Sequence, residues 1–311
     1  MVVHAQFRVY WYSTHKPYAF PWKIISSEKN WVILYKSNRN NQTTGCSMVK
    51  VYTIASGKGG TGKTTVSVNL GTMLAQLGKE TFLMDADIGM ANVGLLLGLQ
   101  DAPVTLHEIL AGKGNINDAI YECPAGLKVI PAGISLQGFQ QADPEKLRDV
   151  MNEIVKRCDF LLIDAPAGIS KDGIVPLAVA DEVILVVNPE LSSIVDALKT
   201  RILTELVGGH VMGSIINRVG QDKTDVMIKK MEKVLGVKVI GIIPEDPNVR
   251  RAASSRTPIV IKFPTSPASK AIRRIASDIT GIAYKDEVEA QKKEGFIERF
   301  TKALFLKKSE P

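Results

Sequence analysis

The segment from Ala55 to Thr65 carries the spacing G-x-x-x-x-G-K-[ST], which is typical of a loop that binds phosphate groups. Its glycines let backbone N–H groups curl around phosphate oxygens, and a helix that starts directly after the loop adds a partial positive charge. We expect Lys63 to reach the β- and γ-phosphates and the Thr64 hydroxyl to ligate Mg²⁺. The predicted loop ligands are Gly57, Lys58, Gly59, Gly60, Thr61, Gly62, Lys63, Thr64 and Thr65, the last of which faces the α-phosphate.

Carboxylates follow two apolar runs later in the chain. The run FLMDADIGMAN places Asp85 and Asp87 at the end of one predicted strand, and FLLIDAPAGIS places Asp164 at the end of another. Ligands of doubly wound folds bind at that edge of the sheet. Four apolar residues before one acid form the Walker B arrangement, so Asp164 is predicted to hold Mg²⁺ or its water. The alternative for Asp85 and Asp87 is that they cap a loop.

The elements that must position these residues alternate from residue 48 to about residue 282. Strands are predicted at 50–55, 81–86, 127–132, 160–165, 182–187, 211–217 and 237–244. Helices are predicted at 63–77, 91–97, 144–157 (with Asp143 as its N-cap), 172–179, 192–206, 223–235 and 266–280. Strands that are apolar on both faces and separated by helices predict an α/β fold. We therefore expect a mostly parallel sheet covered by helices on both faces.

Composition is that of an ordinary globular protein. The chain has 311 residues, of which 45% are apolar and 23% charged, and it contains no apolar run long enough for a transmembrane helix. The three cysteines, Cys46, Cys123 and Cys158, include no CxxC pair, which argues against zinc, an iron–sulfur cluster or a disulfide framework. A reducing cytoplasm is the simplest compartment for such a chain.

The formal net charge of +7 is concentrated at the N-terminus. Residues 1–47 carry six Lys/Arg and one acid, a net charge of +5, which leaves +2 for all later residues. That small remainder argues against a broad basic surface for nucleic acid in the main domain.

Residues 1–47 differ from the rest of the chain. They hold all three tryptophans and four of the seven tyrosines, and they show neither helical periodicity nor a hairpin turn signal. The sequence MVKVYTIASGKGG then begins with Met48 and enters a strand directly. We interpret Met48 as the natural start and the preceding residues as the product of an upstream start assignment; the alternative is a poorly ordered N-terminal arm.

The stretch KGGTGKT resembles the deviant Walker A box, xKGGxGK[ST], of the ParA/MinD group of ATPases. The resemblance implies a P-loop NTPase fold of the SIMIBI type. It also implies that Lys58 crosses a dimer interface to the phosphates of the partner subunit, so that ATP favours a sandwich dimer. The alternative is that Lys58 is a surface lysine in solvent.

Other segments extend the resemblance over residues 48–280. Asp85 to Asn92 resembles switch I, in which Asp87 orients the attacking water and is an indirect Mg²⁺ ligand; Lys58, Lys63 and Asp87 are thus the implied catalytic residues. The turn with Pro166 and Gly168 resembles switch II. The guanine-reading NKxD motif is absent, and the segments IINRV and IIPEDPNVRRAA resemble those around the adenine ring, which implicates Asn217, Arg218, Pro244 and Asp246.

The last residues, GFIERFTKALFLKK at 295–308, have an amphipathic pattern. On a helix, Phe296, Ile297, Phe300 and Leu304 share one face, and Glu298, Arg299 and Lys302 lie opposite. Such a helix could bind at a membrane surface, as the C-terminal helix of MinD proteins does, or it could pack on the domain. Two helices brought together by a dimer would bind lipid more strongly than one.

Taken together, the segments look most like the archaeal MinD-type proteins. This implies three regions: the extension 1–47, an ATPase domain 48–282 and a tail 283–311. It implies an ATPase with Mg²⁺ as cofactor that cycles between a membrane-bound dimer and a cytosolic monomer in cell division or polar positioning, with an unidentified protein activator or cargo. The alternatives are a partitioning ATPase that binds DNA non-specifically, an iron–sulfur carrier, or a nucleotide-binding protein without turnover.

Overall fold

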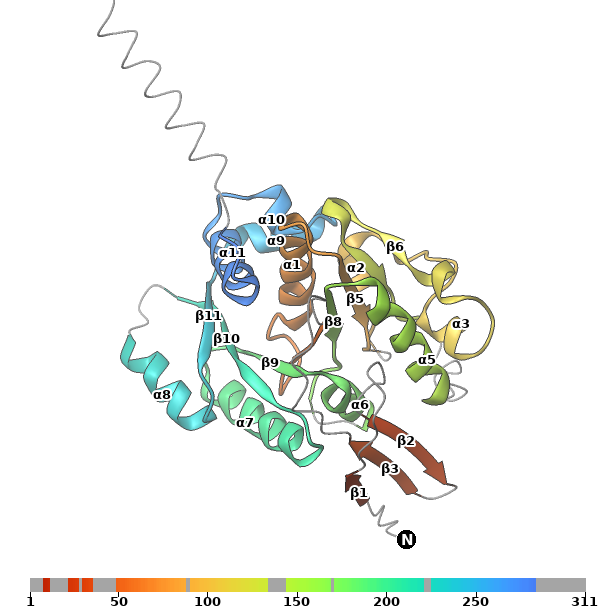
Figure 1. The fold of residues 1–311 in the computed structure, drawn as a ribbon. Helices are drawn as coiled ribbons and strands as arrows, with labels where there is room; N and C mark the ends of the chain where they lie inside the picture. Colours follow the sequence, from red (N-terminus) through yellow and green to blue (C-terminus); the bar gives the residue numbers. More distant parts are fainter. Residues whose placement is uncertain are drawn as a thin grey trace, which may run out of the picture.

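The main sheet has eight strands, and the nucleotide-loop strand β4 lies near its middle. The computed structural model describes residues 8–11, 22–27, 30–35, 49–87, 90–133, 144–168, 171–220 and 225–283. The strand order is β11-β10-β9-β4-β8-β5-β7-β6 (Figure 1). Every neighbouring pair is parallel except β6 and β7, which are antiparallel. The strands are β4 (Lys50–Ala55), β5 (Thr81–Asp85), β6 (Tyr121–Glu122), β7 (Lys128–Ile130), β8 (Phe160–Asp164), β9 (Glu182–Val187), β10 (Val211–Val219) and β11 (Val239–Pro244).

Helices cover both faces of this sheet, which confirms the predicted fold class. They are α1 (Lys63–Gln76), α2 (Val93–Leu97), α3 (Leu106–Leu110), α5 (Pro144–Ile154), α6 (Lys171–Val179), α7 (Leu191–Leu206), α8 (Asp225–Leu235), α9 (Pro247–Ser254), α10 (Ile259–Lys262) and α11 (Pro267–Thr280). Alternate residues of each strand point to opposite faces of the sheet and pack in different cores. Tyr52 and Ile54 of β4 pack with α1 and α9–α11, whereas Val51 packs toward α3 and α5. Ala55 packs toward α6, α7 and α8.

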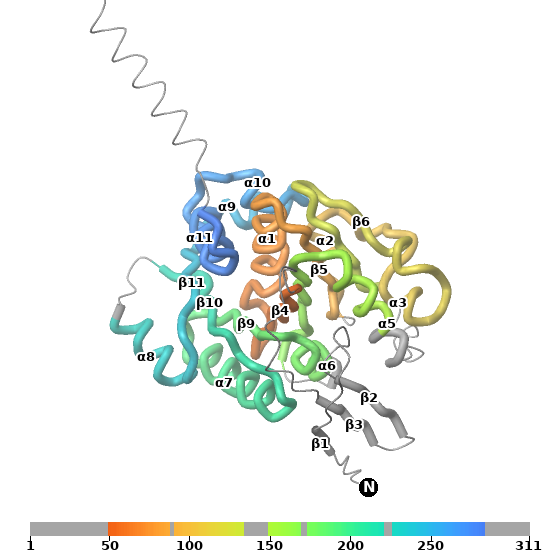
Figure 2. Tube along the Cα trace, viewed as in Figure 1, coloured from red at the N-terminus to blue at the C-terminus, as the bar shows by residue number. Residues whose placement is uncertain are grey.

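Figure 2 shows the path that matters for the site: β4 runs through the middle of the sheet and its end leads into α1. The strand is buried from Val51 to Ala55 and pairs with β8 on one side and β9 on the other. The loop after β4 therefore emerges at the carboxyl edge beside the ends of β8 and β9. Loops from several parallel strands meet at this edge.

Residues 1–47 include a hairpin, although their sequence carries no hairpin turn signal. Strands β1 (Arg8–Trp11), β2 (Trp22–Ser27) and β3 (Asn30–Tyr35) form a separate sheet in the order β1-β3-β2. β2 and β3 are antiparallel, with Ser27 opposite Asn30, so they form a hairpin. The runs WKIISS and NWVILY are rich in aromatic and β-branched residues, which favour strands even without an Asn-Gly type of turn.

Sequence patterns predicted the short helix α2 but missed the short elements α3, β6, α9 and α10. α3 has only five residues, and its start is held by a capping box in which Thr105 and Glu108 bond reciprocally. α9 begins with Asp246 as N-cap and Pro247 at the first position, a start signal that was assigned to nucleotide contacts instead. The proposed cap Asp143 lies outside the described residues. Among the described helices, none has the length and apolar content to cross a bilayer.

Candidate active site

The loop between β4 and α1 adopts a shape that requires glycine. Gly60 and Gly62 have φ angles of 78° and 90°, in the left-handed region that other residues avoid. A Cβ on Gly57 would collide with the backbone of Asp196 in α7, whereas a Cβ on Gly59 would meet nothing within 4 Å. The loop is therefore packed against α7 at its first glycine and open at the third residue.

The start of α1 is suited to an anion. Its N-cap, Gly62, offers no side-chain hydrogen bond, and the first turn contains no acidic residue. Acidic residues are normally common at that position, because they accept hydrogen bonds from the unpaired amides and neutralise the partial positive charge of the helix dipole. Their absence here leaves the amides and the dipole for an external negative group.

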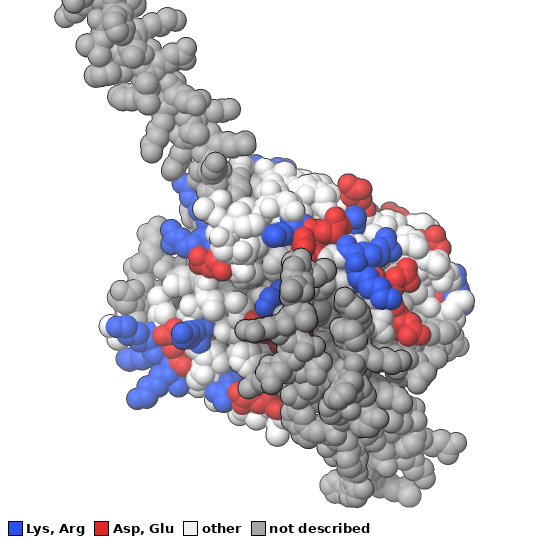
Figure 3. Space-filling view, viewed as in Figure 1, with Lys and Arg blue, Asp and Glu red and all other residues white. Residues whose placement is uncertain are grey.

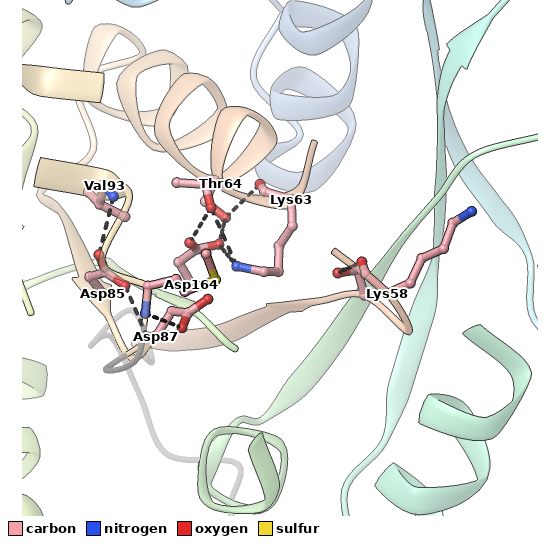
Figure 4. A network of polar contacts seen from close by, with 10 residues as sticks. Lys58, Lys63, Thr64, Asp85, Asp87, Val93 and Asp164 are labelled. Atoms are coloured by element: carbon pink, nitrogen blue, oxygen red, sulfur yellow. Dashed lines mark hydrogen bonds and ion pairs between the residues drawn. The ribbon is translucent and has the colours of Figure 1, made fainter. Parts of the chain in front are cut away.

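Asp164 lies at the centre of the polar network shown in Figure 4. Lys63 Nζ lies 2.9 Å from Asp164 Oδ1, and the Thr64 hydroxyl donates to Asp164 Oδ2 over 2.7 Å. Ser67, one helical turn after Lys63, donates to Asp164 Oδ1 over 2.7 Å. The sequence interpretation missed Ser67, although its i+4 spacing from Lys63 places both on one face of α1.

The neighbouring acid, Asp85, is fully buried and supports a loop. Its carboxylate oxygens accept hydrogen bonds from the backbone amides of Asp87 (3.0 Å) and Val93 (3.2 Å). Burial raises the pKa of Asp85 to about 8, and the Asp164 carboxylate acts in the same direction. These contacts favour the capping role for Asp85.

Asp87 lies beside this network, on the half-buried stretch after β5 (Figure 4). Its carboxylate accepts a hydrogen bond from the backbone amide of Met90 over 3.1 Å. Asn92 directly precedes α2, as its N-cap residue. The structure thus brings Asp87, Lys63 and Asp164 to one edge of the sheet.

Lys58 points away from Lys63 and Asp164, as Figure 4 shows. Its ammonium lies 2.9 Å from Glu190 Oε2 and 3.0 Å from Ser192 Oγ, at the start of α7. Because 31% of the Lys58 side chain is exposed, this ion pair is screened by solvent. Glu190 and Ser192 were absent from the predicted site.

Asn217 holds the phosphate loop in place. It is 8% exposed, and its side-chain amide donates to the Thr61 carbonyl over 2.7 Å. A Cβ on Gly62 would collide with that amide, so the two residues are matched in size. The next residue, Arg218, has a φ of 57° and lies at the register shift between β10 and β11.

Pro244 and Asp246 lie at the end of the neighbouring strand, at the same edge of the sheet. Pro244 ends β11, and Asp246 is buried. The two Asp246 oxygens accept hydrogen bonds from the amides of Asn248 (2.9 Å) and Ala268 (3.2 Å), which begin α9 and α11. Asp246 therefore has a structural role at this edge, and its contact with adenine remains a prediction.

The described residues contain no cluster of three or more His, Cys, Asp or Glu that could enclose a metal ion. Mg²⁺ in nucleotide sites is normally held by one or two carboxylates together with phosphate oxygens and waters. Thr64 and Asp164, which are already in contact, fit that pattern. The predicted membrane residues Phe296, Ile297, Phe300 and Leu304 lie outside the described part of the chain.

A glycine loop between strand and helix, with its Lys and Thr bonded to an acid at the end of the adjacent strand, defines a P-loop nucleotide-binding domain. Residues 52–259 match the family described as the CobQ/CobB/MinD/ParA nucleotide binding domain. The chain belongs to this family of nucleotide-binding ATPases, as its deviant Walker A box predicted.

Known proteins agree with this assignment. An ATP-binding protein of Methanocaldococcus jannaschii is 51% identical over 252 residues, which cover 81% of this chain and 95% of that protein. The cell division ATPase MinD of Pyrococcus furiosus superposes with a TM-score of 0.69 at 37% identity, covering 76% of this chain and all of that structure. MinD of Pyrococcus horikoshii, solved with Mg-ADP, gives 0.69 at 35% identity over 75% of this chain and 96% of that one.

Proposed function

We propose that this ATPase forms an ATP-dependent dimer that binds the membrane and returns to the cytosol as a monomer after hydrolysis. In this cycle it positions cell-division machinery or another polar structure, with a protein activator or cargo still to be identified. The observation that carries the proposal is the direction of Lys58, which leaves its own phosphate loop and lies at an exposed edge.

The same edge exposes large apolar side chains. Met90, which follows β5, is 74% exposed, and Leu191, which follows β9 and adjoins Glu190 and Ser192, is 78% exposed. Apolar side chains at the centre of a protein interface contribute strongly to binding when they are buried. A second copy placed on this edge would cover them and bring its own Lys58 toward the phosphate loop.

Nucleotide charge explains why such a dimer would depend on ATP. Two copies facing each other at this edge place two lysines close together, which disfavours association. A triphosphate in each loop supplies negative charge to both lysines, and charge-assisted hydrogen bonds to phosphate are among the stronger ones in proteins. In this proposal Lys58 exchanges Glu190 for the phosphates of the partner.

The roles of the other residues follow from their contacts. Loop amides and the start of α1 bind the phosphates, and Lys63 moves from Asp164 to the β- and γ-phosphates. Thr64 and Asp164 would hold Mg²⁺, which neutralises charge that develops on the phosphates during transfer. Asp87 orients the attacking water, and Asn217, Arg218, Pro244 and Asp246 surround the base. Turnover is slow until an activator reorders the switch segments.

Light scattering tests the dimer. The variant Asp87→Ala, which should block hydrolysis, should double its molar mass with ATP and Mg²⁺ and stay monomeric with ADP. Wild-type protein provides the control, because its dimer should decay as ATP is consumed. A monomer at saturating ATP would contradict the proposal.

Vesicle sedimentation tests the membrane cycle. The full chain should sediment with vesicles in ATP and much less in ADP or without nucleotide. Phe300→Asp should abolish sedimentation, whereas Thr301→Asp, which adds the same charge outside the apolar cluster of Phe296, Ile297, Phe300 and Leu304, should reduce it less. Equal sedimentation in all nucleotide states would overturn the membrane switch.

A partitioning ATPase that binds DNA is the alternative function. It requires affinity for duplex DNA that falls steeply with salt. Nucleotide-dependent binding to DNA, with no binding to vesicles, would favour that function instead.

A further inference from the structure

Charge is strongly segregated within the domain. Residues 247–283, which contain α9, α10 and α11, carry seven Lys/Arg and a single acid, Asp278, for a net charge of +6. Residues 48–246 carry nineteen Lys/Arg and twenty-four Asp/Glu, for a net charge of −5, and the tail from residue 284 carries +1. The +2 that the sequence shows after residue 47 is therefore an average over an acidic body and one basic segment.

The basic side chains of this segment face outward. Six of the seven are exposed and are called the cationic face below: Arg250, Arg251, Arg256, Lys262, Lys270 and Arg274. The seventh, Arg273, is buried and donates to the Pro264 carbonyl over 3.1 Å. Within the described ranges, no Asp or Glu forms an ion pair with any residue of the cationic face. These charges are thus available to an external anion.

The cationic face stands on a packed framework. Asp246 joins the starts of α9 and α11, because its two oxygens accept amide hydrogen bonds from both helices. The undersides of the three helices, including Ala252, Ile259 and Ile272, lie in the core against the sheet. Figure 3 shows Lys and Arg atoms along the upper left of the molecule, over the position of α11 in Figure 1. The basic side chains therefore project from three helices that are packed into one framework.

The position of the chain end indicates the kind of anion. α11 ends at Thr280, and the described chain stops at residue 283, so the tail follows directly on the helix that carries Lys270 and Arg274. Residues 295–308 have the sequence of a basic amphipathic helix. An extended anionic surface would meet both the tail and the cationic face.

We propose that the cationic face binds the headgroups of an anionic bilayer directly, as a second contact beside the tail. This inference rests on the proposed membrane association. Each basic residue near an anionic bilayer strengthens binding by about five-fold, and the effect decays within a Debye length. The face would thus add affinity, select for anionic lipid and orient the domain relative to the bilayer.

Two triple variants of the full chain test the face. Arg250→Gln with Lys270→Gln and Arg274→Gln removes three of its charges. Lys229→Gln with Lys230→Gln and Lys233→Gln removes three exposed lysines of α8, so its net charge changes equally. Both are titrated, with ATP and Mg²⁺, against vesicles of phosphatidylcholine alone and vesicles with about a third phosphatidylglycerol.

The first variant should bind the anionic vesicles roughly a hundred-fold more weakly than wild type, and the α8 variant within a few-fold of wild type. Wild-type binding should also weaken as salt rises. Equal losses in the two variants would show a general charge effect and overturn the inference, as would wild-type affinity in the first variant. Melting temperature and ATP turnover check that both variants fold; if the first does not, salt-independent binding of wild type to anionic vesicles overturns the inference instead.

The nucleotide arms separate this inference from the proposed cycle. If the first variant binds weakly but wild type sediments equally in ATP and ADP, lipid binding by the cationic face is supported and the nucleotide-dependent membrane switch is contradicted. If sedimentation depends on the bound nucleotide but both variants bind like wild type, the membrane switch is supported and lipid binding by the cationic face is contradicted. Duplex DNA is titrated in parallel, and a loss confined to DNA would assign the face to nucleic acid rather than lipid.

Discussion

At the scale of single residues, the site depends on how three buried ionisable side chains, Lys63, Asp85 and Asp164, share a small volume. Asp164 forms an ion pair with Lys63 and accepts hydrogen bonds from the Thr64 and Ser67 hydroxyls. Asp85 is paired opposite Asp164 on the adjacent strand and has only backbone amides as donors. The two carboxyl groups therefore have different surroundings, and burial raises the pKa of Asp85.

This difference predicts a pH-dependent stability. Asp85 has a pKa of about 8 in the folded protein, which is above its value in the unfolded chain. At a pH between the two values, the folded protein therefore binds more protons than the unfolded chain. The contribution of Asp85 to the free energy of unfolding therefore falls as pH rises from about 4 to 8, by at most about 1.4 kcal/mol per pH unit. Asp85→Asn should remove this slope in urea unfolding measured without nucleotide or metal. Identical slopes for wild type and variant would show that Asp85 is ionised throughout.

Ser67 gives a second test at this scale. Ser67→Ala removes one buried hydrogen bond to Asp164 and should lower the free energy of unfolding by about 1–3 kcal/mol. It should also weaken the binding of Mg²⁺, so that turnover needs a higher Mg²⁺ concentration, because Asp164 loses a donor that orients it. Thr204→Ala is the control, since its buried hydroxyl donates only to the Thr200 carbonyl of its own helix. A change in Mg²⁺ dependence in the control as well would contradict the assignment.

At the scale of elements, the phosphate loop is shaped by α7 and β10 as much as by its own sequence. Gly57 packs on the backbone of α7, and Asn217 at the end of β10 bonds the Thr61 carbonyl. A substitution at Gly57 must therefore separate the loop from α7.

Gly57→Ala should lower the free energy of unfolding by about 1–3 kcal/mol and strongly weaken ATP binding. Gly59→Ala is the matched control, because its added Cβ meets nothing within 4 Å. Thermal unfolding and fluorescent-nucleotide titration measure the two effects. Wild-type ATP affinity in Gly57→Ala would show that the loop tolerates displacement from α7.

Sequence patterns predicted the long elements well and missed several of the short ones. Strands β4 and β9 match their predicted bounds, because runs of β-branched residues between turns leave little ambiguity. α3 and α10 have five and four residues, too few for a helical period to emerge. The contacts of Lys63, Thr64 and Asp164 could be predicted from their motifs, whereas those of Lys58 with Glu190 and Ser192 join residues more than 130 positions apart.

At the scale of the whole molecule, the two lysines of the loop face different directions, so their substitution by alanine should impair different properties. Lys63→Ala removes a charge from the loop itself, so it should weaken ATP binding. Lys58→Ala should leave ATP binding within a few-fold of wild type but abolish the ATP-dependent dimer and the turnover that depends on it. Fluorescent-nucleotide titration and mass photometry measure the two properties. A dimer in Lys58→Ala would remove this lysine from the interface.

The loop after β4 is synthesised early. Asn217, whose side chain donates a hydrogen bond to the Thr61 carbonyl of this loop, lies 156 positions later in the chain. A nascent chain on the ribosome therefore carries the glycine motif long before it can keep a nucleotide. ATP is a ligand of the finished domain, and it can slow unfolding but cannot guide the first steps of folding. The nucleotide can therefore stabilise only chains in which the strand carrying Asn217 is already in place.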